Sequence, residues 1–121
     1  VVVLGHTHCG AISATIEQLL KPVENQSRHL QSLVDRVRPS IEGLLHTELR
    51  NDPPALALHG MRANIGVSVS HLRHGSVVLE KLIRDDGLRI VADERPFTVH
   101  DVQLQVHAAA TQGLYGFGRG A

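Results

Sequence analysis

The feature that most constrains this chain is its opening stretch, in which an apolar run is followed by a glycine, a histidine–cysteine pair and a second glycine. Residues 1–4 are all β-branched or aliphatic, the composition of a strand buried on both faces. Gly5 ends the run, and apolar residues recur at helical spacing over residues 11–20. Strand, tight turn and helix form the unit that carries ligand sites in open parallel sheets. The sequence therefore predicts an α/β fold with a candidate site in this turn.

Two residue types in the turn are good zinc ligands, namely His6 and Cys9. Zinc is bound by imidazole and thiolate, commonly in a tetrahedron of four ligands, and residues three apart across the turn can share one ion. A helix N-terminus also favours the thiolate form of Cys9. Spacing alone supports equally a buried cysteine beside a surface histidine. His8 is expected to face solvent or to support the ligands rather than to bind the metal.

The composition limits the partners and the compartment. Twelve basic residues balance twelve acidic ones among 121 residues, so no nucleic-acid partner is expected. No apolar run reaches the ~20 residues that cross a bilayer, so no membrane partner is expected either. The single cysteine excludes an internal disulfide and predicts a reducing, cytoplasmic location. Because the first residue already belongs to a core-type strand, we expect the chain to be part of a larger domain.

Helical patterns continue downstream of the first helix. Residues 30–45 are amphipathic, and Pro39 predicts a kink or a short break within them. Asp52 is the expected N-cap of a third helix, which begins at Pro53-Pro54. The residues of this helix that we expect to face inward are Leu58, Met61, Ile65, Val69 and Leu72. Ser76 is the expected cap of a short fourth helix.

The last part of the sequence predicts strands and a tail. Asp86-Gly87 closes the fourth helix, because glycine tolerates the left-handed conformation found at helix ends. Residues 88–91 are expected to form a strand parallel to residues 1–4. Residues 97–106 alternate in part and predict an edge strand or a hairpin arm. The glycine-rich end beyond residue 108 is typical of a frayed terminus.

The segment Gly5-His6-Thr7-His8-Cys9-Gly10-Ala11 resembles the glycine-His-x-x-Cys-glycine-alanine segment of the β-class carbonic anhydrases. The similarity to bacterial members continues through residues 14–20, 24–28, 34–40, 62–65 and 71–76. It covers residues 1–91, about three quarters of the chain. The fold that it implies is α/β, a partial parallel sheet with crossover helices.

The resemblance also implies chemistry. His6 and Cys9 match two of the family's three permanent zinc ligands, so the implied cofactor is zinc. The implied enzyme is a lyase that hydrates carbon dioxide reversibly to bicarbonate and a proton by zinc-bound hydroxide. Its members are homo-oligomers, dimers or higher, with the active site near a dimer interface.

Two departures from the family pattern shape our expectations. The family's other zinc cysteine and its catalytic aspartate lie upstream, in a Cys-x-Asp-x-Arg segment that this sequence does not contain. We therefore expect a C-terminal fragment that has no catalytic residue of its own and is inactive by itself. The alternative is a catalytically silent zinc-binding or interaction fragment.

The second departure begins at residue 92. We divide the chain into residues 1–91, the C-terminal portion of a carbonic anhydrase domain, and residues 92–121, a divergent edge strand and flexible tail. The remaining histidines are expected to be solvated or to cap helices. Asp85 and Asp86 are expected to serve turn chemistry rather than acid–base catalysis.

Overall fold

The computed structural model describes residues 1–96 and residue 98. The element order in this part is β1 (Val2–Leu4), α1 (Gly10–Leu20), α2 (Arg28–Ile41), the 3-10 helices η1 (Glu42–His46) and η2 (Glu48–Asn51), α3 (Pro53–His74), α4 (Val77–Asp85) and β2 (Val91–Asp93). One strand therefore precedes all the helices in the sequence and the other follows them. The predicted α/β class, a small parallel sheet with crossover helices, is confirmed.

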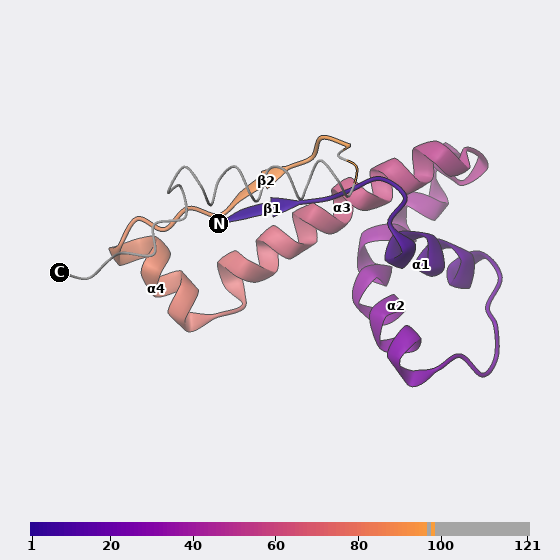
Figure 1. Cartoon of the computed structure of the whole chain (residues 1–121), viewed down its shortest axis with the longest axis horizontal. Coiled ribbons are helices and arrows are strands. Elements are labelled where there is room, and N and C mark those ends of the chain that lie inside the picture. Colours follow the sequence, from indigo (N-terminus) through magenta and orange to yellow (C-terminus); the bar gives the residue numbers. More distant parts are fainter. Residues whose placement is uncertain (97, 99–121) are drawn as a thin grey trace.

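The two strands form a parallel pair in which Val2 lies opposite Val91. They run along one side of α3 (Figure 1). The strand predicted at residues 88–91 is wrong by three residues, because β2 begins only at Val91. Leu88 is used to close the preceding helix, since its N–H donates to the carbonyl of Leu82 at 3.1 Å. Pairing then starts where the N–H of Val91 donates to the carbonyl of Val1 at 2.9 Å.

The expectation that residues 1–4 are buried on both faces is wrong for the described chain. Val1 is 51% exposed and Val2 is 46% exposed, while the next two residues are half-buried. The physical reason is the size of the sheet, which has two strands in the described part and packs against α3. The edge of β1 away from β2 therefore has no strand partner among the described residues.

Side-chain caps mark the starts of α3 and α4. Asp52 accepts a hydrogen bond from the N–H of Ala55 at 3.1 Å, and Ser76 accepts one from Leu79 at 3.4 Å. Both predicted caps are confirmed. After α4 the chain turns at Gly87, whose φ of +68° is a conformation that side chains rarely adopt.

The break expected at Pro39 lies two residues further on. Pro39 is inside α2, which continues to Ile41 before the backbone tightens into η1. Proline removes one N–H donor and restrains its neighbours, but a single lost hydrogen bond can be tolerated in the last turn of a helix. Burial favours the extra turn, because Ser40 and Ile41 are both buried there.

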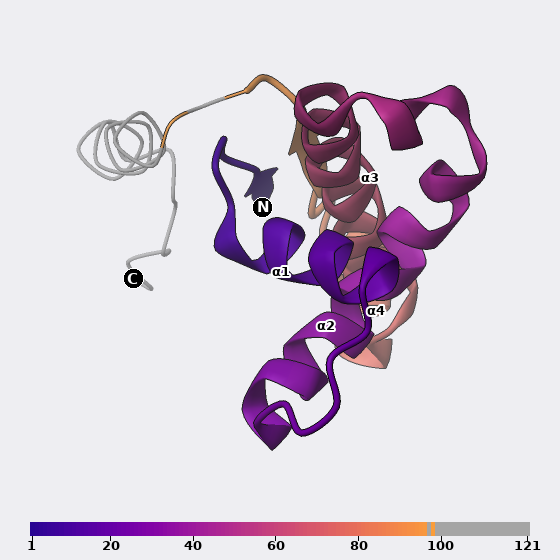
Figure 2. The same ribbon diagram turned by 90° about the vertical axis from the view of Figure 1, so that its right-hand side faces the viewer.

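Figure 2 shows α1 and α2 beside α3, and the hydrophobic core lies where these helices meet. Met61, Ile65 and Val69 of α3 are buried as predicted, whereas Leu58 and Leu72 are half-buried. The other buried members of this cluster come from α1, from α2 and from the chain just before β2: Ile12, Val37, Ile41 and Ile90. The strand predicted at residues 97–106 and the tail beyond it lie outside the described residues, apart from Thr98.

Candidate metal centre

The candidate site begins where β1 meets α3, at Gly5. This residue is buried, and a Cβ atom added to it would lie 2.6 Å from Sδ of Met61 and 2.7 Å from Cδ1 of Ile65. Real Cβ contacts are longer than this, so only glycine fits without movement of the helix side chains. The close approach holds the following turn against α3.

The turn between β1 and α1 places a cysteine at a helix start. His8 has a φ of +54°, which is uncommon for a residue with a side chain and lets the chain reverse direction. Cys9 is then the N-cap of α1, and its carbonyl accepts the first helical hydrogen bond from Ser13 at 3.0 Å. The side chain of Cys9 makes no capping hydrogen bond. The sulfur of this half-buried residue is therefore not committed to the helix.

The orientation of His6 leaves one ring nitrogen available. Its Nδ1 lies 2.9 Å from the carbonyl oxygen of Thr7. A carbonyl can only accept a hydrogen bond, so Nδ1 must carry the proton and donate. Nε2 then has the free lone pair, the arrangement in which a backbone carbonyl fixes the tautomer of a metal-binding histidine.

His6 and Cys9 line one cavity of about 470 Å³. Thr7 and His8 complete the wall that the turn provides, and His8 is exposed. The opposite wall comes from the start of α3 and from α1, and it is mostly apolar: Ile12, Ser13, Pro53, Pro54, Ala57, Leu58 and Met61. Both predicted ligands thus line the same pocket, which has an apolar wall.

The segment after β2 also reaches the cavity, through Pro96. Its backbone is fixed by Arg62 of α3, whose Nε donates to the carbonyl of Glu94 at 3.1 Å. Asp93 and Arg95 form an ion pair beside it, and the hydrogen bond from the guanidinium lowers the pKa of the Asp93 carboxyl below its usual value. Sequence reasoning did not foresee the contact between Arg62 and Glu94, because these residues are 32 positions apart.

A third metal ligand is not found in the described part of the chain. Among residues 1–96 and 98, no group of three or more histidine, cysteine, aspartate or glutamate side chains is arranged to hold a metal ion. His71 and His74, one helical turn apart, belong to the other end of α3 and do not line the cavity. Asp85 is ion-paired with Lys81 at 2.9 Å.

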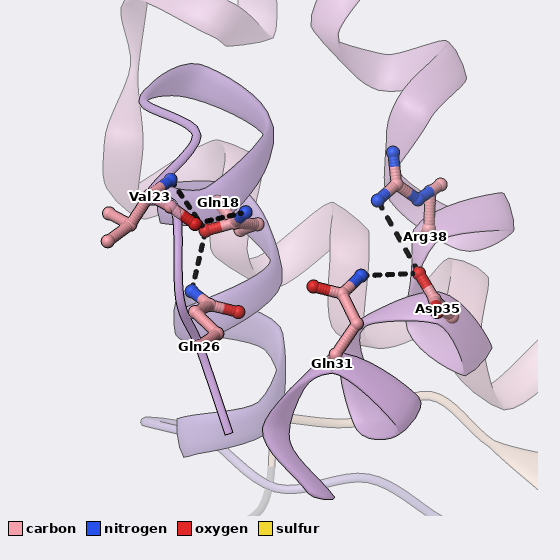
Figure 3. A network of polar contacts seen from close by, with 6 residues as sticks. All are labelled: Gln18, Val23, Gln26, Gln31, Asp35 and Arg38. Carbon is pink, nitrogen blue, oxygen red and sulfur yellow. Dashed lines mark hydrogen bonds and ion pairs between the residues drawn. The ribbon is translucent and has the colours of Figure 1, made fainter. Parts of the chain in front are cut away.

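A second hollow, of about 660 Å³, lies beside the loop that joins α1 to α2. Figure 3 shows the polar contacts there: the side chain of Gln18 holds both backbone groups of Val23, and Asp35 accepts from Gln31 and pairs with Arg38. These contacts shape the loop. No histidine or cysteine lines this hollow, so the candidate metal centre is the smaller cavity.

The walls that α3 contributes were missed by sequence reasoning. Pro53 and Pro54 were recognised only as the start of a helix, and Leu58 only as a core residue. Their separation of more than forty positions from His6 carries no local signal. The packing of α3 against the turn at Gly5 is what brings them to the site.

Comparison with known proteins gives one finding. The family profile described as "Carbonic anhydrase" matches residues 1–93. Neither the curated proteins nor the solved structures give a match. Within the described residues, no helix has both the length and the apolar character that a membrane crossing requires.

Proposed function

Because the chain belongs to the carbonic anhydrase family, of the β class, we propose that it serves the reversible hydration of carbon dioxide, with His6 and Cys9 as ligands of zinc. The observation that carries this proposal is the cavity into which the turn brings both residues. The Nε2 lone pair of His6 and the uncommitted thiol of Cys9 are the donors that zinc prefers.

The donor atoms of His6 and Cys9 are of the kinds that zinc prefers, but two donors are fewer than a zinc site needs. A zinc site commonly has four ligands, and the described residues provide two. The remaining positions would be filled by water and by donors outside the described residues. When bound, zinc supplies a nucleophile at neutral pH by acidifying water.

Residues of the chain itself would provide the surface against which carbon dioxide binds. Carbon dioxide carries no charge and no net dipole, so an apolar wall suits it. Leu58 and Met61, with the prolines at the start of α3, provide such a wall opposite His6 and Cys9. The Thr7 carbonyl would orient the His6 ring, while Cys9 at the start of α1 keeps its sulfur free of capping contacts and available to a metal.

The alternative function is a catalytically silent zinc-binding or interaction fragment. The two-donor count in the described residues favours it for the isolated chain, because removing even a group that orients a ligand commonly lowers affinity or activity by 10–100-fold. We therefore expect carbon dioxide hydration by the 121-residue chain at the background rate. Zinc-dependent turnover in a stopped-flow pH assay, lost in Cys9→Ala, would contradict this expectation.

Zinc content measured in substituted proteins tests whether His6 and Cys9, rather than another histidine, bind the metal. Zinc bound by the full chain would be measured by equilibrium dialysis and elemental analysis, with His6→Ala, Cys9→Ala and the control His59→Ala. His59 lies on an exposed part of α3 outside the cavity lining. We expect both ligand variants to lose zinc affinity and the control to keep it. Equal zinc binding in all four proteins would refute the assignment.

We also propose that the protein forms a homo-oligomer, as the family resemblance implies, and that it is located in the cytoplasm. Cys9 must remain a reduced thiol to bind zinc, which supports a reducing compartment. The exposed apolar residues Val1, Val2 and Val91 on the sheet support self-association.

A further inference from the structure

A third hollow lies at the opposite end of α3 from the candidate metal centre. It measures about 320 Å³ and lies between the last turn of α3, helix α4 and the chain entering β2. The 22 residues of α3 extend over ~33 Å at 1.5 Å per residue. The hollow is therefore separate from the cavity that contains His6 and Cys9.

The residues that line this hollow are basic or apolar. Arg73, His74 and Arg89 carry the polar groups, and no aspartate or glutamate is among the lining residues. In the described part of the chain, neither arginine forms an ion pair, although four other cations do, namely Arg38, Lys81, Arg84 and Arg95. Two uncompensated guanidinium groups at one hollow favour an anion.

One of these guanidinium groups is already held in place. The Nη2 of Arg73 donates to the carbonyl of Ile90, which ties the side chain to the wall of the hollow. A guanidinium has five N–H donors, so most of them stay available after this bond. Its planar fork matches the geometry of phosphate and carboxylate oxygens. Fixing the side chain in advance reduces the ordering that a bound anion would require.

The remaining walls are apolar and define the size of the ligand. Ile90 is 3% exposed, and Ile83 and Leu88 are half-buried. The volume lies near the lower limit of small-molecule sites, which begin at about 300 Å³. Such walls suit a ligand that has a compact organic part beside its charge.

We propose that this hollow binds the phosphate group of a small organic phosphate ester. A phosphate monoester carries between about one and a half and two negative charges at neutral pH, which matches two arginines better than a carboxylate does. Its organic part lies against Ile83 and Leu88. This inference is independent of the proposed zinc chemistry.

The probe for the test is phenyl phosphate, titrated into the full chain and followed by calorimetry and by amide chemical shifts. Inorganic phosphate separates the charge from the ring, and phenol tests the ring alone. We expect phenyl phosphate to bind more tightly than inorganic phosphate, and phenol not to bind. Benzoate binding as tight as phenyl phosphate would overturn the choice of phosphate.

Variants locate the site. Arg89→Gln removes a side chain that forms no hydrogen bond or ion pair within the described residues, so the fold should be kept, and we expect affinity to fall about fivefold or more. Arg73→Gln should weaken binding similarly, while the control Arg84→Gln, which alters an ion-paired arginine outside the lining, should not. Unchanged affinity in both Arg73→Gln and Arg89→Gln would refute the proposal, as would loss of binding in Cys9→Ala.

Discussion

Replacing Gly5 by alanine tests whether the close approach of β1 to α3 positions the candidate site. The new Cβ would lie 2.6 to 2.8 Å from Met61 and Ile65 atoms, so each side chain must move by roughly 1 Å to restore van der Waals contact. Overpacking of this kind costs about 1–3 kcal/mol. The smaller conformational freedom of alanine in the unfolded chain offsets about 0.4–1 kcal/mol of that. We expect a net loss of roughly 1–2 kcal/mol in the free energy of unfolding.

The matched control for this change is Gly66→Ala. Gly66 lies in α3, is exposed, and a Cβ there would meet nothing within 4 Å. Alanine should stabilise the helix at that position by about 0.5–1 kcal/mol. The two substitutions are therefore expected to change stability in opposite directions.

Urea denaturation of the full chain, followed by circular dichroism, measures both variants. The double variant Gly5→Ala, Met61→Ala opens space for the new methyl group, so the two changes should be less destabilising together than their sum. Metal titration of Gly5→Ala then reports whether the shifted turn also weakens zinc binding. A stability for Gly5→Ala equal to that of Gly66→Ala would refute the packing argument.

Three further substitutions test separate parts of the structure. Asp52→Ala removes the side-chain cap that accepts from the N–H of Ala55 at the start of α3. It should lower the free energy of unfolding by ~1 kcal/mol, measured by denaturant melts. The pKa of Asp93 is lowered in the folded chain by its hydrogen bond from Arg95, so this pair stabilises the fold above the usual carboxyl pKa and is lost as pH falls through the lowered value. Asp93→Asn should therefore be less sensitive to acid in melts between pH 5 and pH 2, and an unchanged acid dependence would contradict the assignment. Val2→Lys places a charge on the exposed edge strand and should reduce self-association in size-exclusion chromatography with light scattering, whereas a parent chain that is already monomeric would refute the proposed oligomer.

Local sequence signals predicted the elements whose ends are marked by side chains. Asp52 and Ser76 cap their helices through their own backbone neighbours, so their positions could be inferred from a few residues. The start of β2 could not be inferred in this way. The N–H of Leu88 bonds to the end of α4, and strand pairing depends on a partner almost ninety positions away. Strand pairing is decided by tertiary contacts, which carry no local pattern.

The same distinction applies to the candidate site. His6 and Cys9 share one turn, so their spacing made a shared site possible, and the family resemblance was needed to favour it over a buried cysteine beside a surface histidine. The apolar wall from Pro53 to Met61 depends on how α3 packs against Gly5, which no motif encodes. The resemblance to carbonic anhydrases named the family, whereas the shape of the cavity required the structure.

The pairing of Val2 with Val91 has a consequence for how the protein folds. These partners are 89 positions apart, so bringing them together carries a loop-closure penalty of ~4 kcal/mol. The helices between them are built from local contacts and can form before the strands meet. The turn that bears His6 and Cys9 is attached to β1, so we expect it to be ordered only after the sheet closes. Metal capture by these two residues would then accompany the last step of folding, and pulsed hydrogen exchange should show protection in α3 before it appears in β1.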